Sequence, residues 1–329
     1  MTGSARPATG MVLGKFLPPH LGHQFLVDFG VTYVDALTVL VCSLKREPIP
    51  GDLRAAWVAD MCPRARVVHV TDENPQEPHE HPDFWPIWIE TIRAHIPAGP
   101  DVVFTSEPYG DDLARRLGAR HVVVDRAREL VPISGTAIRE RPVAHWQYLP
   151  PPVRPYFVKR VVVFGPESTG KSTLARDLAR HYGTAWVSEY ARGYLDNKGA
   201  RFEQDDFPLF VAGQHAAEDA LARQANRVLF CDTDALTTVI FHRLFYGMAP
   251  DCLVAAADSR RYDLYLVLDV DVPWVDDGQR DAPGNREALR DRYVSELAAR
   301  GRPAVLIRGS WPERFAAACR AVDQLLQEA

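Results

Sequence analysis

Arg160-Val-Val-Val-Phe-Gly-Pro-Glu-Ser-Thr-Gly-Lys-Ser-Thr173 carries the strongest fold signal in the second half of this chain. It fits the pattern GxxxxGK[ST], with an apolar strand pattern before it and a helical pattern, Lys171–Tyr182, after it. In that context backbone N–H groups wrap the phosphates of a nucleotide, and the N-terminus of the helix adds partial positive charge. The stretch therefore predicts a P-loop that binds ATP; the alternative is a glycine turn that only joins a strand to a helix.

The chemistry of the loop assigns a role to each polar position. We expect Lys171 to supply positive charge to the β- and γ-phosphates and the Ser172 hydroxyl to bind Mg²⁺. The remaining ATP-binding candidates of the loop are Gly165, Glu167, Ser168, Thr169, Gly170 and Thr173.

Polar side chains follow two further strands of the second half. In Phe230-Cys-Asp-Thr-Asp234 we expect Asp232 to organise Mg²⁺ or its bound water, because ligands bind at the carboxyl ends of parallel strands. Asp234 is a candidate for the same role or for substrate contact, and the alternative is a helix cap. In Ser188-Glu-Tyr-Ala-Arg192, Glu189 is the candidate general base of a kinase, with Tyr190 and Arg192 as substrate contacts. The alternative there is the acidic first turn of a surface helix.

An arginine-rich segment near the C-terminus resembles a closing lid. Residues 274–292 contain glycines between arginines, which suits a hinged segment over a transferring phosphate. We expect Arg280 and Arg286 to bind ATP, whereas a solvated helix explains Arg290 and Arg292 equally well.

The first half carries a second pair of phosphate motifs. Gly14-Lys-Phe-Leu-Pro-Pro-His-Leu-Gly-His23 follows the first expected strand, and the imidazoles of an HxGH sequence at a helix start can donate to phosphate oxygens. About a domain length later, Ile133-Ser-Gly-Thr-Ala-Ile-Arg139 offers a helix-capping serine and an arginine to phosphate. Both motifs in this order predict a nucleotidyltransferase. Its candidate residues are Gly14, Lys15, Phe16, His20, His23, Ser134, Thr136 and Arg139, and the basic cluster of Arg126, Arg128, Arg139 and Arg141 fits phosphate handling.

Strand and helix patterns alternate in both halves, which predicts an α/β protein with two parallel sheets covered by helices. The expected strands are Met11–Phe16, Leu37–Cys42, Arg66–Val70, Val102–Thr105, His121–Val124, Arg160–Phe164, Arg227–Cys231, Leu264–Leu268 and Ala304–Ile307. The run Leu149-Pro-Pro-Pro-Val-Arg-Pro155 supports neither a helix interior nor a central strand. We therefore expect two domains, residues 1–150 with a Rossmann-like fold and residues 151–329 with a P-loop fold.

Composition narrows the class further. The 329 residues carry a net charge of −5 and a pI of about 6.1, which does not favour a nucleic-acid binder. The five widely spaced cysteines indicate free thiols in a reducing compartment. Without an apolar run of roughly 20 residues or a signal-peptide core, a cytoplasmic protein that binds no membrane is expected.

This series of motifs resembles the NadR family, in which nicotinamide-nucleotide adenylyltransferase is joined to ribosylnicotinamide kinase. The resemblance rests on GKFLPPHLGH, on TSEP at Thr105–Pro108, on ISGTAIR, and on GPESTGKST, SEYAR, CDTDALTT and PWVDDGQR in one order. It implies the salvage of pyridine nucleotides to NAD, with ATP as co-substrate of both steps and Mg²⁺ as cofactor. Nicotinamide riboside and nicotinamide mononucleotide would be the substrates. His20, His23, Ser134 and Arg139 match the phosphate-binding residues of the transferase, and Lys171, Ser172 and Asp232 match the P-loop, Mg²⁺ and Walker-B positions of the kinase.

Some family members also carry an N-terminal helix-turn-helix repressor domain, and only nine residues precede Gly10 here. DNA binding is therefore not expected. Two rivals remain: a different adenylyltransferase fused to a different kinase, acting for instance on pantetheine phosphate or a sugar, and an NAD-sensing regulator. Trp85 and Trp88 favour a pyridinium substrate, because a flat cation stacks well on indole, although core packing explains either residue as easily. The oligomeric state is left open, and a homo-oligomer is compatible with the sequence.

Overall fold

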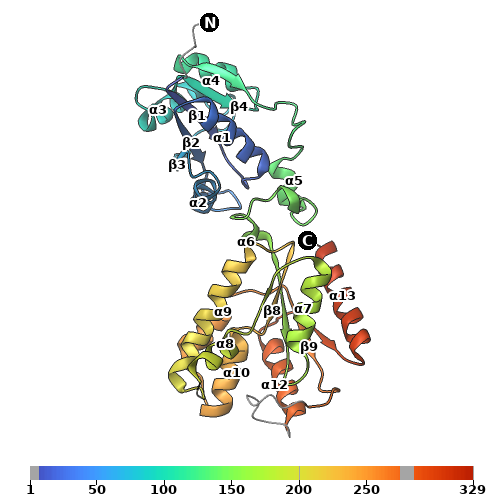
Figure 1. Cartoon of the computed structure of the whole chain (residues 1–329). Coiled ribbons are helices and arrows are strands. Elements are labelled where there is room, and N and C mark those ends of the chain that lie inside the picture. Colours follow the sequence, from blue (N-terminus) through green and yellow to red (C-terminus); the bar gives the residue numbers. More distant parts are fainter. Residues whose placement is uncertain (1–6, 200, 275–284, 329) are drawn as a thin grey trace. The chain divides into compact units, whose positions relative to one another are not determined.

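The computed structural model describes residues 7–199, 201–274 and 285–328. The chain forms two compact units that divide between Val153 and Arg154. Each unit is an α/β layer structure with one five-stranded sheet, and all strand pairs are parallel (Figure 1). The predicted fold class is confirmed.

The first unit is built on a sheet of strand order β3-β2-β1-β4-β5. Its strands are β1 (Thr9–Gly14), β2 (Ala36–Cys42), β3 (Arg66–Val70), β4 (Val102–Thr105) and β5 (Arg120–Val123). The order reverses between β1 and β4, and the carboxyl ends of strands at such a switch point are the usual place for a ligand.

Helices cover both faces of this sheet. Helices α1 (Leu21–Tyr33) and α2 (Gly51–Met61) pack on one face through Val27, Val31 and Val58. Helices α3 (Phe84–His95) and α4 (Gly110–Leu117) pack on the other through Ile92 and Leu113. The chain then continues through α5 (Gly135–Glu140) and a short 3₁₀ turn, η1 (Trp146–Tyr148).

The second unit has the strand order β10-β9-β6-β8-β7. Its strands are β6 (Lys159–Phe164), β7 (Trp186–Val187), β8 (Val228–Asp232), β9 (Leu264–Leu268) and β10 (Ala304–Ile307). The central strand β6 is fully apolar from Val161 to Phe164, because both of its faces are covered.

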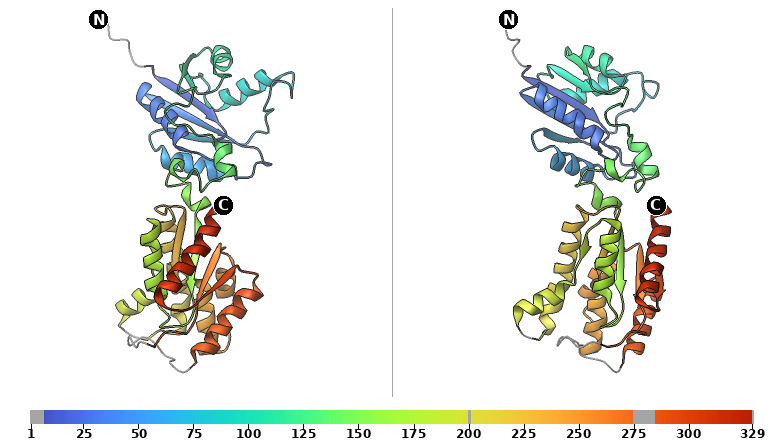
Figure 2. Two further views of the ribbon diagram at one scale, coloured as in Figure 1. Left: turned by 90° about the vertical axis from the view of Figure 1, so that its right-hand side faces the viewer. Right: turned by 45° about the vertical axis from the view of Figure 1, so that its right-hand side comes forward.

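Figures 1 and 2 show α7 (Lys171–Tyr182) and α13 (Trp311–Gln327) side by side against one face of the second sheet. Helices α9 (Phe207–Ala222) and α10 (Ala235–Tyr246) lie on the opposite face, with α11 (Asp251–Asp258) packed against both. The remaining helices are α6 (Arg154–Phe157), α8 (Tyr190–Lys198), η2 (Gln204–Asp206) and α12 (Arg286–Ala299).

The bounds of the nine predicted strands agree with the observed ones within two residues, and α7 has its predicted bounds. Helix α11 was not expected from the sequence, since eight residues are too few for a clear apolar period. Helix α6 begins inside the proline run because Pro155 stands in the first turn, where a missing N–H breaks no helical bond. All five cysteines are free. Among the described residues, no helix is both long enough and apolar enough to span a bilayer.

Candidate active sites

A pocket at the carboxyl ends of β1 and β4 collects the candidate residues of the first half. Residues from both phosphate motifs line it, although the motifs lie more than a hundred positions apart in the sequence. The predicted residues that line this pocket are Gly14, Lys15, Phe16, His20, His23, Trp85, Trp88, Ser134, Thr136 and Arg139.

The two histidines stand at the start of α1. The His20 side chain caps the helix, because its Nδ1 accepts from the Gly22 backbone N–H at 3.1 Å. The ring centroids of His20 and His23 are 3.8 Å apart. Burial, assisted by the charge of Arg128, lowers the pKa of His20 to about 4. Burial, then His20 and Arg128, also holds the pKa of His23 well below its usual range. Both imidazoles are therefore neutral at pH 7, and His20 carries its proton on Nε2.

A buried ion pair holds the loop that carries Lys15. The guanidinium of Arg54, on α2, is fully buried and donates to the Lys15 carbonyl and, at 2.6 Å, to a Glu47 carboxylate oxygen. The Lys15 ammonium lies 3.4 Å from the same carboxylate, and about half of its side chain is exposed. Arg54 was not predicted from the sequence, yet it fixes the backbone beside the pocket.

The second motif contacts the first directly. The Arg139 guanidinium donates to the Leu17 carbonyl and, at 3.1 Å, to the Thr136 hydroxyl. A Cβ at Gly135 would lie 2.5 Å from the Leu17 oxygen, so this close approach requires glycine. Ser134 caps α5 by accepting from the Ala137 N–H at 3.2 Å, as the sequence predicted.

Two further side chains line the same pocket and were not singled out from the sequence. Arg128 projects near both histidines and pairs with Glu107 at 3.1 Å. The Tyr109 hydroxyl donates to the Leu13 carbonyl at 3.2 Å and so holds the carboxyl end of β1. Arg128 was visible in the sequence only as one member of a basic cluster.

The two tryptophans differ in their surroundings. Trp88 lies on the buried face of α3, and its indole N–H donates to the Pro75 carbonyl at 2.8 Å. Trp85 is half-buried, and the Arg116 guanidinium stands 4.8 Å from the centre of its ring. The core-packing alternative therefore describes Trp88 well, although both rings also line the pocket.

A second pocket lies over the P-loop of the second unit. It is lined by the predicted residues Glu167, Ser168, Gly170, Lys171, Ser172, Thr173, Glu189, Arg192 and Asp234. Gly165 begins the loop against the Leu268 carbonyl, and the buried Thr169 hydroxyl donates to the Pro166 carbonyl at 2.8 Å. The Lys171 ammonium donates to that carbonyl too, at 2.9 Å.

A buried arginine supports the P-loop from behind. Arg314, on α13, is fully buried and donates to the Thr169 carbonyl and the Asp269 carbonyl, each at 2.9 Å, and pairs with Asp271. Arg314 therefore links the P-loop to the segment that follows β9. The sequence had not indicated it.

Asp232 and Ser172 provide a pair of oxygen groups at the base of the pocket. The Ser172 hydroxyl hydrogen-bonds to the Asp232 carboxylate, and Oδ1 of Asp232 is buried with no partner among the described residues. Burial raises the pKa of Asp232, while the charge of Lys171 and the bond to Ser172 oppose that rise. An orphaned acceptor beside a hydroxyl fits Mg²⁺, which is bound by few protein oxygens, substrate phosphates and water. Among the described residues, no group of three or more histidine, cysteine or acidic side chains could hold a metal ion.

The SEYAR residues separate into two environments. Glu189 precedes α8 and lies near Lys171 and Asp232, with its carboxylate 3.8 Å from the Arg192 guanidinium. Burial raises the pKa of Glu189, and the charge of Lys171 opposes that effect. Tyr190 is not among the residues that line the pocket, because its ring lies against Gly213 of α9.

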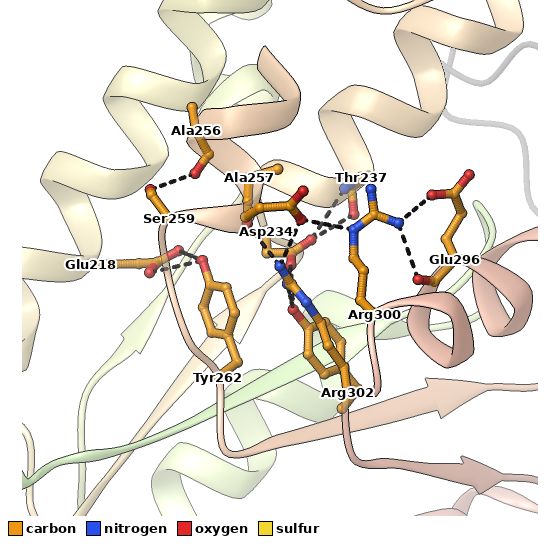
Figure 3. Close-up of polar contacts among 12 residues, drawn as sticks. Glu218, Asp234, Thr237, Ala256, Ala257, Ser259, Tyr262, Glu296, Arg300 and Arg302 are labelled. Atoms are coloured by element: carbon orange, nitrogen blue, oxygen red, sulfur yellow. Dashed lines mark hydrogen bonds and ion pairs between the residues drawn. The ribbon is translucent and has the colours of Figure 1, made fainter. Parts of the chain in front are cut away.

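Asp234 is engaged in a buried polar network (Figure 3). One carboxylate oxygen accepts from the Thr237 N–H at 3.1 Å and caps α10, and the other accepts from the Tyr265 hydroxyl at 2.7 Å. Arg302 donates to the Tyr265 hydroxyl and lies 3.5 Å from the same carboxylate. The helix-cap alternative therefore describes Asp234, and substrate contact at this residue stays a prediction.

The arginines of the expected lid are only partly described. Arg286 begins α12 and donates to the Ser168 carbonyl of the P-loop at 3.3 Å and to the Val272 carbonyl at 3.0 Å. Arg290 pairs with Asp269 at 2.7 Å, and both side chains are mostly buried. Arg280 lies outside the described residues.

An aromatic wall completes the second pocket and was missed in the sequence. Five phenylalanines line it, and they come from the segment before α9 and from α9 and α10: Phe202, Phe207, Phe210, Phe241 and Phe245. The rings of Phe241 and Phe245 are stacked with centroids 6.1 Å apart, as the i, i+4 spacing on α10 allows. That spacing was the available signal, but it is equally typical of core packing.

The two α/β units and the P-loop place this protein among the ATP-binding α/β enzymes. A family model described as an AAA domain matches residues 160–314. The trifunctional NAD biosynthesis/regulator protein NadR of Escherichia coli (strain K12) is 32% identical over 291 residues, which cover 82% of this chain and 71% of that protein. Its counterpart in Salmonella typhimurium (strain LT2) is 31% identical, over 88% of this chain and 76% of that protein.

The chain therefore belongs to the NadR family of NAD biosynthesis enzymes, as the motifs predicted. Two solved structures agree on the fold. A NadR protein in complex with NR is 23% identical with a TM-score of 0.80, and the match covers 98% of this chain and 96% of that one. A NadR protein in complex with NAD and AMP-PNP is 24% identical with a TM-score of 0.79 and the same coverage.

Proposed function

We propose that this enzyme makes NAD⁺ from nicotinamide riboside in two ATP-dependent steps. The second unit phosphorylates the riboside to nicotinamide mononucleotide, and the first unit transfers AMP to the mononucleotide with release of pyrophosphate. The observation that carries the proposal is the pair of complete phosphate pockets within one chain of the NadR family. The names of the two similar structures, with NR and with NAD and AMP-PNP, support the same substrates.

In the kinase step, the riboside 5′-hydroxyl attacks the γ-phosphorus of ATP. Glu189 accepts the hydroxyl proton, a role that its raised pKa and its place between Lys171 and Asp232 support. Lys171 and Arg192 neutralise the charge of the transferring phosphoryl group. Ser172 and Asp232 would hold Mg²⁺, which would offset the negative charge of the phosphates when it is bound.

In the transferase step, a phosphate oxygen of the mononucleotide attacks the α-phosphorus of ATP. No protein nucleophile is needed, so the pocket acts by positioning the reactants and by stabilising charge. The neutral His20 and His23 donate hydrogen bonds to phosphate oxygens, while Lys15, Arg128 and Arg139 supply the positive charge. Trp85, the half-buried indole, offers a stacking surface to the pyridinium ring.

Product analysis tests this proposal directly. The purified protein is incubated with Mg²⁺, ATP and either nicotinamide riboside or nicotinamide mononucleotide, and the products are separated by chromatography. We expect ADP and mononucleotide from the first incubation, followed by NAD⁺, and pyrophosphate and NAD⁺ from the second. Turnover of pantetheine phosphate but not of the mononucleotide would support the rival transferase instead. NAD⁺ binding without turnover of either substrate would support an NAD-sensing regulator.

A further inference from the structure

Gln214 of α9 stands in the wall of the P-loop pocket, and the mechanism above does not use it. Its side chain is 4% exposed. The side-chain oxygen accepts from the backbone N–H of Tyr190 at 3.0 Å. A backbone N–H can donate only to the oxygen of a carboxamide, so this bond fixes the orientation of the amide. The Nε2 group must therefore face away from Tyr190.

The Nε2 group of Gln214 has no hydrogen-bond partner among the described residues, and it is buried. A buried donor without a partner has lost its water and gained nothing in return, so such groups are rare and call for an explanation. In a pocket that receives a polar substrate, the simplest explanation is an acceptor atom on that substrate.

The position of Gln214 indicates which part of the substrate it meets. Tyr190, to which it is bonded, directly follows the candidate base Glu189, and a Cβ at Gly213 would lie 2.2 Å from the Tyr190 ring. Tyr190, at the start of α8, thus contacts the adjacent residues Gly213 and Gln214 of α9. Gln214 and Glu189 line the same pocket, so one bound substrate can contact both side chains.

The pocket offers different surroundings to the aromatic ring and to the ribose of the substrate. The phenylalanine side chains described above form an apolar wall that suits a flat aromatic cation, and among the described residues that line the pocket Gln214 is the one carboxamide. We infer that Gln214 is a specificity-determining residue of the kinase, whose Nε2 donates to a ribose hydroxyl oxygen of the acceptor riboside. This inference rests on the proposed kinase function.

Deoxy analogues test the hydrogen bond without changing the protein. Rates of phosphorylation are measured for nicotinamide riboside and for its 2′-deoxy and 3′-deoxy forms. We expect the wild-type protein to lose about 10-fold or more in kcat/KM with at least one analogue, because the amide donor is then left unpaired. Equal kcat/KM values for all three ribosides would overturn the inference.

Two substitutions then connect that loss to Gln214. In Gln214→Glu the acceptor for the Tyr190 N–H is retained and the donor is removed, whereas Gln214→Leu removes both. We expect each variant to have a lower kcat/KM for the full riboside and to lose most of its discrimination against the critical deoxy analogue. Gln224→Glu, an exposed position two residues beyond α9, makes the same charge change outside the pocket and should retain the discrimination.

The outcomes separate this inference from the proposed function. If a folded Gln214→Glu protein discriminates against both deoxy analogues as strongly as the wild type, Gln214 only fastens α8 to α9 and the inference is wrong. If the wild type phosphorylates a different nucleoside, the proposed kinase substrate fails, and the same comparison is made with the deoxy forms of that nucleoside. Circular dichroism of each variant confirms that a lost discrimination does not arise from unfolding.

Discussion

At the scale of single residues, the two pockets present different groups to the phosphates that we propose they bind. The first pocket presents two neutral histidines whose charged forms are disfavoured by burial, and its positive charge comes from Lys15, Arg128 and Arg139. The second pocket presents Lys171 within a backbone loop and two acidic groups whose pKa values burial raises, Asp232 and Glu189. Substitutions in the two pockets should therefore have separable effects.

Lys171→Ala should abolish phosphorylation of the riboside and spare adenylyl transfer to the mononucleotide. Loss of a phosphate-facing charge in a desolvated site removes several kcal/mol of transition-state stabilisation, which is roughly a 10²-fold or larger loss of rate. Both activities are measured on the same preparation, so the transferase is the internal control for folding. A kinase rate near that of the wild type would exclude the assigned role of Lys171.

His20→Ala and His23→Ala should each lower adenylyl transfer by about 10²-fold with little loss of cooperative folding, since each removes a donor to phosphate. His95→Ala, outside the pocket, is the matched control. Because the pKa of His20 lies at about 4, its neutral form is complete above pH 6. The rate of adenylyl transfer should therefore not change between pH 6 and 8 through protonation of His20. A rate that rises below pH 6.5 would show that the imidazolium is the active form.

The lowered pKa of His20 also predicts how the stability of the folded protein changes with pH. The unfolded state binds a proton at His20 below its ordinary pKa of 6.5, whereas the folded state does so only below about 4. Stability from this group is therefore present above pH 6.5 and is lost as pH falls towards 4, by about 2–3 kcal/mol. Chemical denaturation of the wild type and of His20→Ala between pH 4 and 7 tests this, and the stability of the wild type relative to the variant should fall as the pH falls.

At the scale of elements, the sequence predicts what short-range patterns encode. Strands β3, β4, β9 and β10 and helix α7 have the predicted bounds, because apolar runs and helix signals lie within the elements themselves. Arg54, Arg314 and Gln214 could not be predicted, since their roles depend on partners far along the chain; Arg314 bonds to a carbonyl 145 residues away. A buried arginine or glutamine has the same local pattern as an exposed one.

Helix α9 also carries a buried acid that faces the segment before β9 (Figure 3). Glu218 is fully buried, accepts from the Tyr262 hydroxyl at 2.9 Å, and pairs with Arg260 at 3.0 Å. Burial raises the pKa of Glu218 to about 7, against the opposing effects of Arg260 and Tyr262. The folded state therefore holds this proton more tightly than the unfolded state, so the stability that it contributes is complete below pH 4.5 and is lost as pH rises through 7.

Glu218→Gln removes this titration, so the variant should not lose the stability that the wild type loses when Glu218 ionises at high pH. We expect the free energy of unfolding of the variant, relative to the wild type, to increase by about 2–3 kcal/mol between pH 4.5 and 8. Glu287→Gln, exposed on α12, is the control for the loss of one negative charge. If the relative stability is constant across this range, Glu218 titrates normally, and the pair with Arg260 outweighs burial.

At the scale of the whole molecule, each unit contains its own run of strands and its own candidate phosphate pocket. The HxGH and ISGTAIR motifs precede Leu149, and the P-loop, Glu189 and Asp232 all follow Pro155. No strand of one sheet pairs with a strand of the other among the described residues. Because the proline run between them can donate few backbone hydrogen bonds, neither sheet depends on the joint for its pairing.

We therefore expect the two activities to be separable at the proline joint. A fragment from Arg154 to Ala329 should phosphorylate nicotinamide riboside, and a fragment that ends near Pro152 should make NAD⁺ from the mononucleotide. Each fragment should unfold in its own cooperative thermal transition, because each retains a complete apolar core of about the size of a stable domain. The measurement is activity per folded molecule. A fragment that folds cooperatively but shows no turnover would mean that its site requires residues of the other unit, and the proposed boundary would then be wrong.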